Sequence, residues 1–252
     1  PERVPQLRED LVRYLNGAAH APLMQAAMVH AQFETIHPFT DGNGRVGRAL
    51  IHTALARRGL TDRAVLPISL VLATLRDGYV TGLTSFRDAS PVGSLEASAA
   101  KGEWLAMFVE AAAIAVEQSE ALAAAIGELH GSWVNRLANH RAARGLRPVP
   151  RAGSAGAQLL SRLPEAPVVT ATTLASILDV SFPAASSALD ELKGAGILAT
   201  KTIERGATAY IAREVLDLIT MSERALASTH FDTRISPPNR GVPTAPAPRP
   251  PA

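Results

Sequence analysis

The dipeptide His37–Pro38 is the feature that most restricts how this chain folds. Proline disfavours the helical conformation at the residue before it, so a helix that approaches this point ends there. Apolar residues recur at helical spacing on both sides of the break, over 22–36 and over 43–58. The sequence therefore predicts two helices joined by a short, glycine-containing turn.

The remainder of the first 140 residues also has a helical pattern. Helices are expected over 4–15, in two pieces over 67–86, and over 104–140 after a Ser-, Gly- and Ala-rich loop at 88–102. No alternation of polar and apolar residues indicates a strand in this part of the chain. We expect a mainly α fold, with a helical bundle domain over 1–140.

The pattern then changes to short elements. Residues 141–156 mix Pro, Gly and Arg without periodicity, which is typical of a linker. Short helices then precede two β-prone runs, 197–203 and 207–212, which together predict a hairpin. This order indicates a small winged-helix domain over 157–228. The Pro- and Ala-rich stretch 236–252 is expected to be disordered.

Composition excludes several classes of protein. The chain has 252 residues, and its formal net charge of +2 is too small to mark a nucleic-acid or membrane surface. The absence of cysteine excludes disulfide scaffolds, Cys-ligated zinc, iron–sulfur clusters and thiol catalysis. No apolar run reaches the roughly 18 residues of a membrane span. We expect a cytoplasmic protein with no membrane partner, and the Ala- and Arg-rich composition is typical of a high-GC bacterium.

The segment that carries chemistry is 37–48, with the sequence HPFTDGNGRVGR. Its glycines at Gly42, Gly44 and Gly47 match the spacing of a dinucleotide-binding fingerprint, with Asp62 about 20 residues further on. That fingerprint leaves a buried strand and opens a crossover helix. Because a helical pattern precedes this segment and no strand pattern follows it in the first domain, the sequence disfavours dinucleotide binding.

The same segment suits the binding of phosphates. Gly42, Asn43 and Gly44 allow backbone N–H groups to approach an anion closely at the N-terminus of a helix. Arg45 and Arg48 lie three residues apart, on one face of that helix, and their guanidinium groups suit a polyphosphate better than a monoanion. The pattern indicates a seat for several phosphate groups.

Two titratable side chains accompany this seat. An isolated carboxylate at Asp41 would repel phosphates, so it is expected to hold a Mg²⁺ ion that bridges to their oxygens. The imidazole of His37 can accept a hydroxyl proton near neutral pH. Glu34-x-x-His37, with His30 nearby, resembles half of a di-iron carboxylate pair, but the sequence holds no second Glu-x-x-His. We therefore infer a site for nucleotidyl or phosphoryl transfer.

The motif His37-Pro38-Phe39-x-Asp41-Gly42-Asn43-Gly44-Arg45-x-x-Arg48 resembles in full the signature of the Fic (filamentation induced by cAMP) family. The resemblance extends over about 1–140. It implies a Fic-type helical bundle and a protein adenylyltransferase (AMPylator). Such an enzyme moves AMP from ATP to a Ser, Thr or Tyr hydroxyl of a target protein and releases pyrophosphate.

The resemblance also implies roles for individual residues. His37 would deprotonate the target hydroxyl, Asp41 would hold Mg²⁺, and Phe39 would anchor the loop in the core. The phosphates of ATP would be bound by Gly42, Asn43 and Gly44 at the α and β positions, and by Arg45 and Arg48 at the β and γ positions. Tyr79 lies where the family usually carries an aromatic residue near the adenine, although Val80 replaces the second tyrosine usual there.

Two features of the family are expected upstream of this sequence. One is the β-hairpin flap that docks the target. The other is an inhibitory helix with an S/T-x-x-x-E-G/N motif, whose glutamate would pair with Arg48. No glutamate in this chain is followed by Gly or Asn, so the sequence places such a helix before residue 1 rather than after it.

Alternatives stay open at this point. Within the family they are a different donor, such as UMP, phosphocholine or phosphate transfer, and AMP removal; the intact Gly44-Arg45 disfavours the phosphate-transfer variants. In another class, a winged-helix regulator would bind DNA while the first domain senses nucleotide. The expected helix 182–193 carries one lysine, offset by Asp190 and Glu191, which favours target docking or a homodimer over DNA.

Overall fold

A computed structural model describes residues 2–61, 65–203 and 206–230 of the chain. Asp62, from the disfavoured dinucleotide interpretation, and the stretch 236–252, expected to be disordered, lie outside the described residues.

The chain divides into two compact units, each described here by itself. Unit 1 consists of Pro1–Ala115 with Glu223–Ala252, and unit 2 consists of Val116–Ser222. The division falls inside one long helix, whereas the sequence predicts a boundary near residue 140. The sequence did not predict a division between Ala115 and Val116, because one helix runs through both residues and its apolar pattern has no break there. As domains, the ranges 1–140, 141–156 and 157–228 stay predictions.

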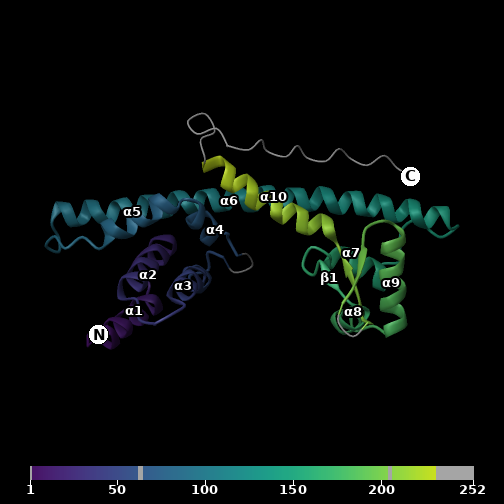
Figure 1. Cartoon of the computed structure of the whole chain (residues 1–252), viewed down its shortest axis with the longest axis horizontal. Helices are drawn as coiled ribbons and strands as arrows, with labels where there is room; N and C mark the ends of the chain where they lie inside the picture. The colour runs from purple at the N-terminus through teal and green to yellow at the C-terminus, as the bar shows by residue number, and fades with distance from the viewer. Residues whose placement is uncertain (1, 62–64, 204–205, 231–252) are drawn as a thin grey trace. The chain divides into compact units, whose positions relative to one another are not determined.

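Unit 1 is helical, and its described residues contain no strand. The helices α2 and α3 pack against each other, as Figure 1 shows. Together with the first part of the long helix α6, the helices of unit 1 are α1 (Val4–Asn16), α2 (Pro22–Ile36), α3 (Asn43–Arg57), α4 (Ile68–Thr74), α5 (Arg76–Phe86) and α6 (Leu95–Ala143). The mainly helical fold expected from the sequence is confirmed.

The core of unit 1 forms around an aromatic residue of α6. Trp104 is fully buried, and its indole Nε1 donates a hydrogen bond to the carbonyl of Ala27 in α2 at 3.0 Å. Phe108 lies one turn further along α6, with its ring centroid 5.6 Å from that of Trp104. Buried Ile51 and Leu55 pack into the same cluster from α3. The helix pair α2–α3 is therefore fixed to α6 by apolar packing and one buried hydrogen bond.

The loop expected over 88–102 is wrong in its second half, because α6 already begins at Leu95. The hydroxyl of Ser94 accepts a hydrogen bond from the backbone N–H of Ala97 at 3.1 Å, which caps the first turn. The helix formers that follow, including Glu96 and Lys101, outweigh Gly102 inside the helix.

Unit 2 combines helices with a small antiparallel sheet of order β1-β3-β2. Tyr210 pairs with Val169 on one side and with Thr200 on the other. The elements after α6 are α7 (Ala155–Arg162), β1 (Val168–Val169), α8 (Ala171–Leu178), α9 (Phe182–Gly194), β2 (Ala199–Thr202), β3 (Thr208–Ile211) and α10 (Arg213–His230). The two predicted strands are present, whereas the short β1 has no pattern of its own. The winged-helix assignment stays a prediction.

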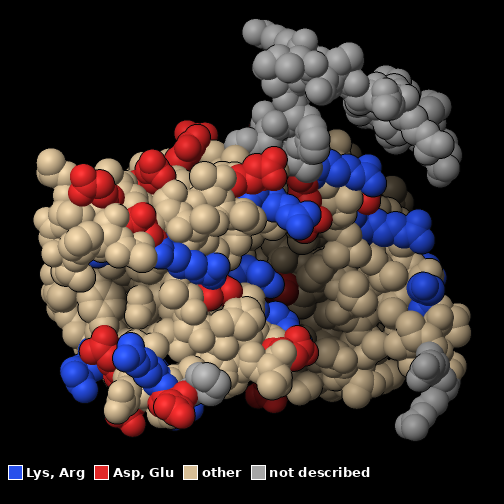
Figure 2. All heavy atoms as spheres, turned by 60° about the vertical axis from the view of Figure 1, so that its left-hand side comes forward, with Lys and Arg blue, Asp and Glu red and all other residues tan. Residues whose placement is uncertain are grey.

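The core of unit 2 forms around Trp133 of α6. Its indole Nε1 donates to Oε2 of Glu214 at 2.9 Å, and the same oxygen accepts from Arg136 at 2.5 Å. On the face drawn in Figure 2, acidic and basic side chains are interspersed. Among the described helices, including the 49-residue α6, none has an apolar stretch that would cross a bilayer.

Candidate active site

The predicted motif forms the turn between α2 and α3. Its first residue, His37, ends α2 with its N–H bonded to the carbonyl of Phe33 at 2.9 Å. Its backbone is left-handed, with φ 47° and ψ 58°. A non-glycine residue in this region is strained by roughly 1–3 kcal/mol, and such residues cluster at functional sites. Gly42 also has a positive φ, 84°, and begins α3.

The turn is held together by Asn43 rather than left open. Asn43 is only 3% exposed, and its side-chain amide donates to the carbonyl of Phe39 at 2.6 Å and accepts from the N–H of Phe39 at 3.0 Å. Both polar ends of this side chain are therefore occupied by the turn itself. Asn43 therefore braces the turn, and its expected contact with the phosphates stays a prediction.

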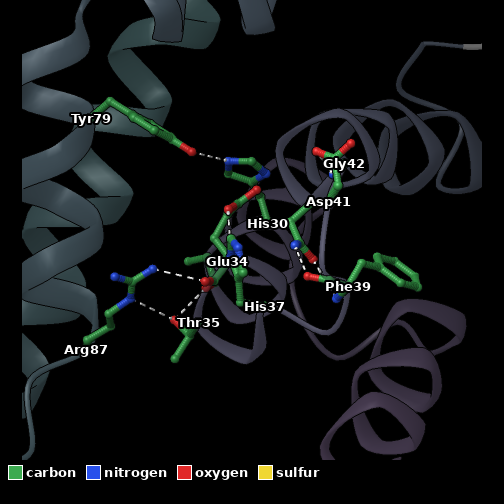
Figure 3. A network of polar contacts seen from close by, with 11 residues as sticks. His30, Glu34, Thr35, His37, Phe39, Asp41, Gly42, Tyr79 and Arg87 are labelled. Atoms are coloured by element: carbon green, nitrogen blue, oxygen red, sulfur yellow. Dashed lines mark hydrogen bonds and ion pairs between the residues drawn. The ribbon is translucent and has the colours of Figure 1, made fainter. Parts of the chain in front are cut away.

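Phe39 does not anchor the turn in the core as expected. Its side chain is 45% exposed, and its ring centroid lies 6.2 Å from that of Phe33. Asn43 fixes the backbone of Phe39 through two hydrogen bonds, which leave the ring outside the core. Figure 3 shows the ring projecting away from the buried polar residues.

The start of α3 has the features of an anion seat. The first N–H groups of a helix have no intrahelical partners, and Gly42 supplies no side chain to cap them. A Cβ placed on Gly42 would lie 3.5 Å from Nη2 of Arg45, and one on Gly44 would lie 3.3 Å from Nη1 of Arg48. Both guanidinium groups therefore lie beside the glycine backbone, where charge and N–H donors favour phosphates.

Asp41 lies at the exposed edge of this seat. One carboxylate oxygen accepts from the N–H of Gly42 at 2.7 Å, and the other lies 3.4 Å from Nη2 of Arg45. The Asp41 side chain is 92% exposed, so the pair with Arg45 is weak. The described residues hold no group of three or more metal-ligating side chains. One accessible carboxylate still fits Mg²⁺, which is commonly held by one or two carboxylates together with substrate phosphates.

A buried polar cluster lies behind the turn. His30 is fully buried in α2, and its Nε2 lies 3.1 Å from the hydroxyl of Tyr79 in α5. Burial lowers the pKa of His30 to about 4 and is also the main cause that raises the pKa of Tyr79 to about 12. Both groups are therefore uncharged near neutral pH. The Tyr79 ring packs edge-on against Trp104 with centroids 6.0 Å apart, so its expected contact with adenine stays a prediction.

Glu34 is the charged member of this cluster. Its side chain is 10% exposed, and Oε2 lies 3.9 Å from Nδ1 of His37. From the end of α5, Arg87 donates to the main-chain carbonyl of Glu34 at 3.0 Å (Figure 3). From the sequence, Glu34 was interpreted only as half of a possible metal pair, and metal binding there was disfavoured. Its spacing of three residues from His37, which places both side chains on one helix turn, was the available signal.

Comparisons with known proteins agree with this geometry. Residues 1–55 match the Fic/DOC family model. A probable protein adenylyltransferase of Aquifex aeolicus (strain VF5) is 36% identical over 78 residues, covering 31% of this chain and 24% of that protein. A protein adenylyltransferase of Caenorhabditis elegans is 37% identical over 71 residues, covering 27% of this chain and 14% of that protein. This chain thus spans a quarter or less of these two relatives.

A solved structure, that of a Fic family protein from Desulfovibrio desulfuricans G20, is also similar. It is 22% identical with a TM-score of 0.39, over 84% of this chain and 55% of that chain. This likeness carries no inference about the present chain, whose relationship rests on the sequence matches. The residues 1–55 that match the Fic/DOC family model include the whole of the segment 37–48.

Proposed function

We propose that this chain transfers AMP from ATP to a Ser, Thr or Tyr hydroxyl of a target protein and releases pyrophosphate. The observation that carries the proposal is the placement of two guanidinium groups, Arg45 and Arg48, beside a glycine turn that starts one helix while an imidazole ends the preceding one. The curated relatives named above as protein adenylyltransferases support the same reaction.

The chemistry follows from the residues of the turn. The first N–H groups of α3 and the guanidinium groups of Arg45 and Arg48 bind the phosphates and neutralise the charge that develops on them. His37 takes the proton of the target hydroxyl as its oxygen attacks the α-phosphorus. The new bond joins that oxygen to the α-phosphorus, and the bond from the α-phosphorus to the oxygen that bridges to the β-phosphorus breaks.

A divalent cation fits this site at Asp41, whose carboxylate is exposed at the edge of the phosphate seat. When bound there, Mg²⁺ supplies charge neutralisation for the phosphates and the leaving pyrophosphate. Asp41 would hold it with help from phosphate oxygens, because the described residues form no group of three or more metal-ligating side chains.

The position of the transferred label tests the proposal. The chain is incubated with Mg²⁺, a lysate of its own cells and ATP labelled either at the α-phosphate or at the γ-phosphate. We expect protein to be labelled from α-labelled ATP only, and His37→Ala to abolish the labelling. Label from the γ-phosphate would indicate phosphate transfer, and label from UTP but not ATP would indicate another donor; either result contradicts AMP transfer.

A further inference from the structure

Glu34 is a buried carboxylate that the transfer reaction as written leaves without a role. Its side chain is 10% exposed, and Oε1 is buried with no hydrogen-bond partner among the described residues. Burying a carboxylate without full pairing is unfavourable for stability. A group kept in such a position therefore calls for an explanation other than folding.

The other oxygen of Glu34 faces His37. Oε2 lies 3.9 Å from Nδ1 of the imidazole, and Figure 3 shows the two side chains directed toward each other at the end of α2. This separation is an ion-pair distance rather than a hydrogen bond, so the attraction becomes strong only when the ring carries a proton on both nitrogens.

The carboxylate of Glu34 is held in place from two sides. In α3, a Cβ on Gly47 would lie 2.4 Å from Oε1, so the carboxylate packs closely against this glycine and a larger residue would make it shift. From α5, Arg87 donates to the main-chain carbonyl of Glu34 at 3.0 Å, and its Nε lies 3.5 Å from the hydroxyl of Thr35. Packing therefore restricts both the backbone and the side chain of Glu34.

We propose that Glu34 is a positioning residue for His37, an inference that rests on the proposed function. Its carboxylate favours the neutral imidazole with the proton on Nδ1, which leaves Nε2 free to accept the hydroxyl proton. Once Nε2 has taken that proton, the ring is positively charged and the Glu34 carboxylate stabilises it. No proton moves to Glu34; the imidazolium later returns its proton to solvent.

A purely structural role predicts a different response to substitution. A methionine at position 34 fills a similar volume without a buried charge, so it should keep or raise the stability of unit 1. If Glu34 served folding alone, that variant would keep its activity. The positioning role instead predicts that activity falls while stability does not.

The tautomer of His37 is the most direct readout, because it needs no turnover. Protein with ¹⁵N-labelled histidine is measured by long-range ¹H–¹⁵N NMR at a pH where the imidazole is neutral, and the His37 signals are identified by their loss in His37→Ala. We expect the Nδ1–H form in the unchanged chain and in Glu34→Gln, whose amide oxygen still places partial negative charge opposite Nδ1. Glu34→Met should shift the population toward Nε2–H. An unchanged tautomer in Glu34→Met would overturn the proposal.

Transfer kinetics supply the second readout. Glu34→Met should lower kcat about 10- to 100-fold with an unchanged KM for ATP, and Glu34→Gln should fall between it and the unchanged chain. Thr53→Val is the matched control and should keep kcat, because Thr53 is exposed on α3 and its hydroxyl donates to the carbonyl of Ala49 in the same helix. A parallel loss of kcat and stability would overturn the proposal. If the chain without any substitution transfers no AMP, the proposed function is overturned. The tautomer measurement then still tests whether Glu34 positions His37.

Discussion

The two units of the chain differ in how their helices are capped at the N-terminus and in how one carboxylate in each is paired. In unit 2, α7, α8 and α9 each begin with a hydroxyl that accepts from the first turn, on Ser154, Thr170 and Ser181. In unit 1, α3 begins at Asn43 after Gly42 and has no side-chain cap, and α1, α2, α4 and α5 begin without one as well. Each hydroxyl cap satisfies one N–H of its helix, whereas the start of α3 has two arginines beside it in place of a cap, as the proposed phosphate seat requires.

The two carboxylates that lie against the cores, Glu214 and Glu34, also differ. In unit 2 one oxygen of Glu214 accepts from both Trp133 and Arg136, so the carboxylate supports the core. In unit 1 one oxygen of Glu34 has no hydrogen-bond partner among the described residues. Unit 2 has an unpartnered buried atom as well, Nε of Arg136, so the difference between the units lies in the two carboxylates themselves. The two tryptophans, Trp104 in unit 1 and Trp133 in unit 2, allow each unit to be followed separately by fluorescence.

The largest expected effect is the acid sensitivity of unit 1. Burial lowers the pKa of His30 to about 4, so the unfolded chain takes up its proton first as the pH falls. The stability contribution is therefore complete above about pH 6.5 and is lost progressively down to pH 4, by about 3 kcal/mol. Urea unfolding of Trp133→Phe, followed through Trp104, measures it. His30→Gln should flatten this pH dependence. If the free energy of unfolding falls with pH equally in both proteins, a group other than His30 causes the fall.

Gly47→Ala should be the most disruptive small substitution at the α2–α3 contact. The added Cβ would lie 2.4 Å from Oε1 of Glu34 and 3.2 Å from Cδ1 of Phe33, so the carboxylate must shift and the Phe33 ring must give way slightly. We expect a loss of about 2 kcal/mol in the free energy of unfolding.

Gly131→Ala is the matched control, because a Cβ on that glycine of α6 meets nothing within 4 Å. It should raise stability by about 0.5–1 kcal/mol through helix propensity. Equal effects of the two substitutions would mean that α2 and α3 are not in close contact at Gly47.

Glu214→Ala tests the shared carboxylate of unit 2. The buried indole N–H of Trp133 would lose its acceptor, and Arg136 would lose its pair. Because the Glu214 side chain is 42% exposed, water replaces part of the interaction, and we expect a loss of about 1.5 kcal/mol. Urea unfolding of Trp104→Phe, followed through Trp133, checks it. AMP transfer should be unaffected, and its loss would show that the carboxylate also serves the reaction.

Thr170→Ala should have the smallest effect of the series. The Thr170 hydroxyl accepts from the N–H of Thr173 at 3.1 Å, and removing this cap of α8 should lower stability by about 1 kcal/mol. The same Trp133 fluorescence measures the change. If stability does not change, the hydroxyl caps of unit 2 do not contribute to its stability.

Much of the helical framework could be predicted because its signals are local. His37–Pro38 marks the end of α2, Gly42 stands just before α3, and Gly59 follows the end of α3. The start of α6 was missed because a single Ser94 cap turns a Ser- and Ala-rich stretch into helix. The strand β1 could not be predicted, since its two residues are strand only through pairing with β3, some 40 residues away.

The candidate site shows where sequence reasoning stops. The motif identifies which residues meet in the turn, but not how each is used. Asn43 braces Phe39 and the Phe39 ring stays exposed, and both results depend on the exact path of the turn. The approach of Glu34 to His37 depends on the left-handed backbone of His37, which a residue other than glycine rarely adopts and no pattern announces.

The mass of a target protein after reaction tests the central claim most directly. A labelled target band is isolated after incubation with the chain, Mg²⁺ and ATP, and is analysed by intact and fragment mass spectrometry beside a His37→Ala control. The account predicts one added AMP on a Ser, Thr or Tyr side chain, absent with the variant. A mass increase equal to phosphate alone, or an AMP adduct that persists in His37→Ala, would contradict it.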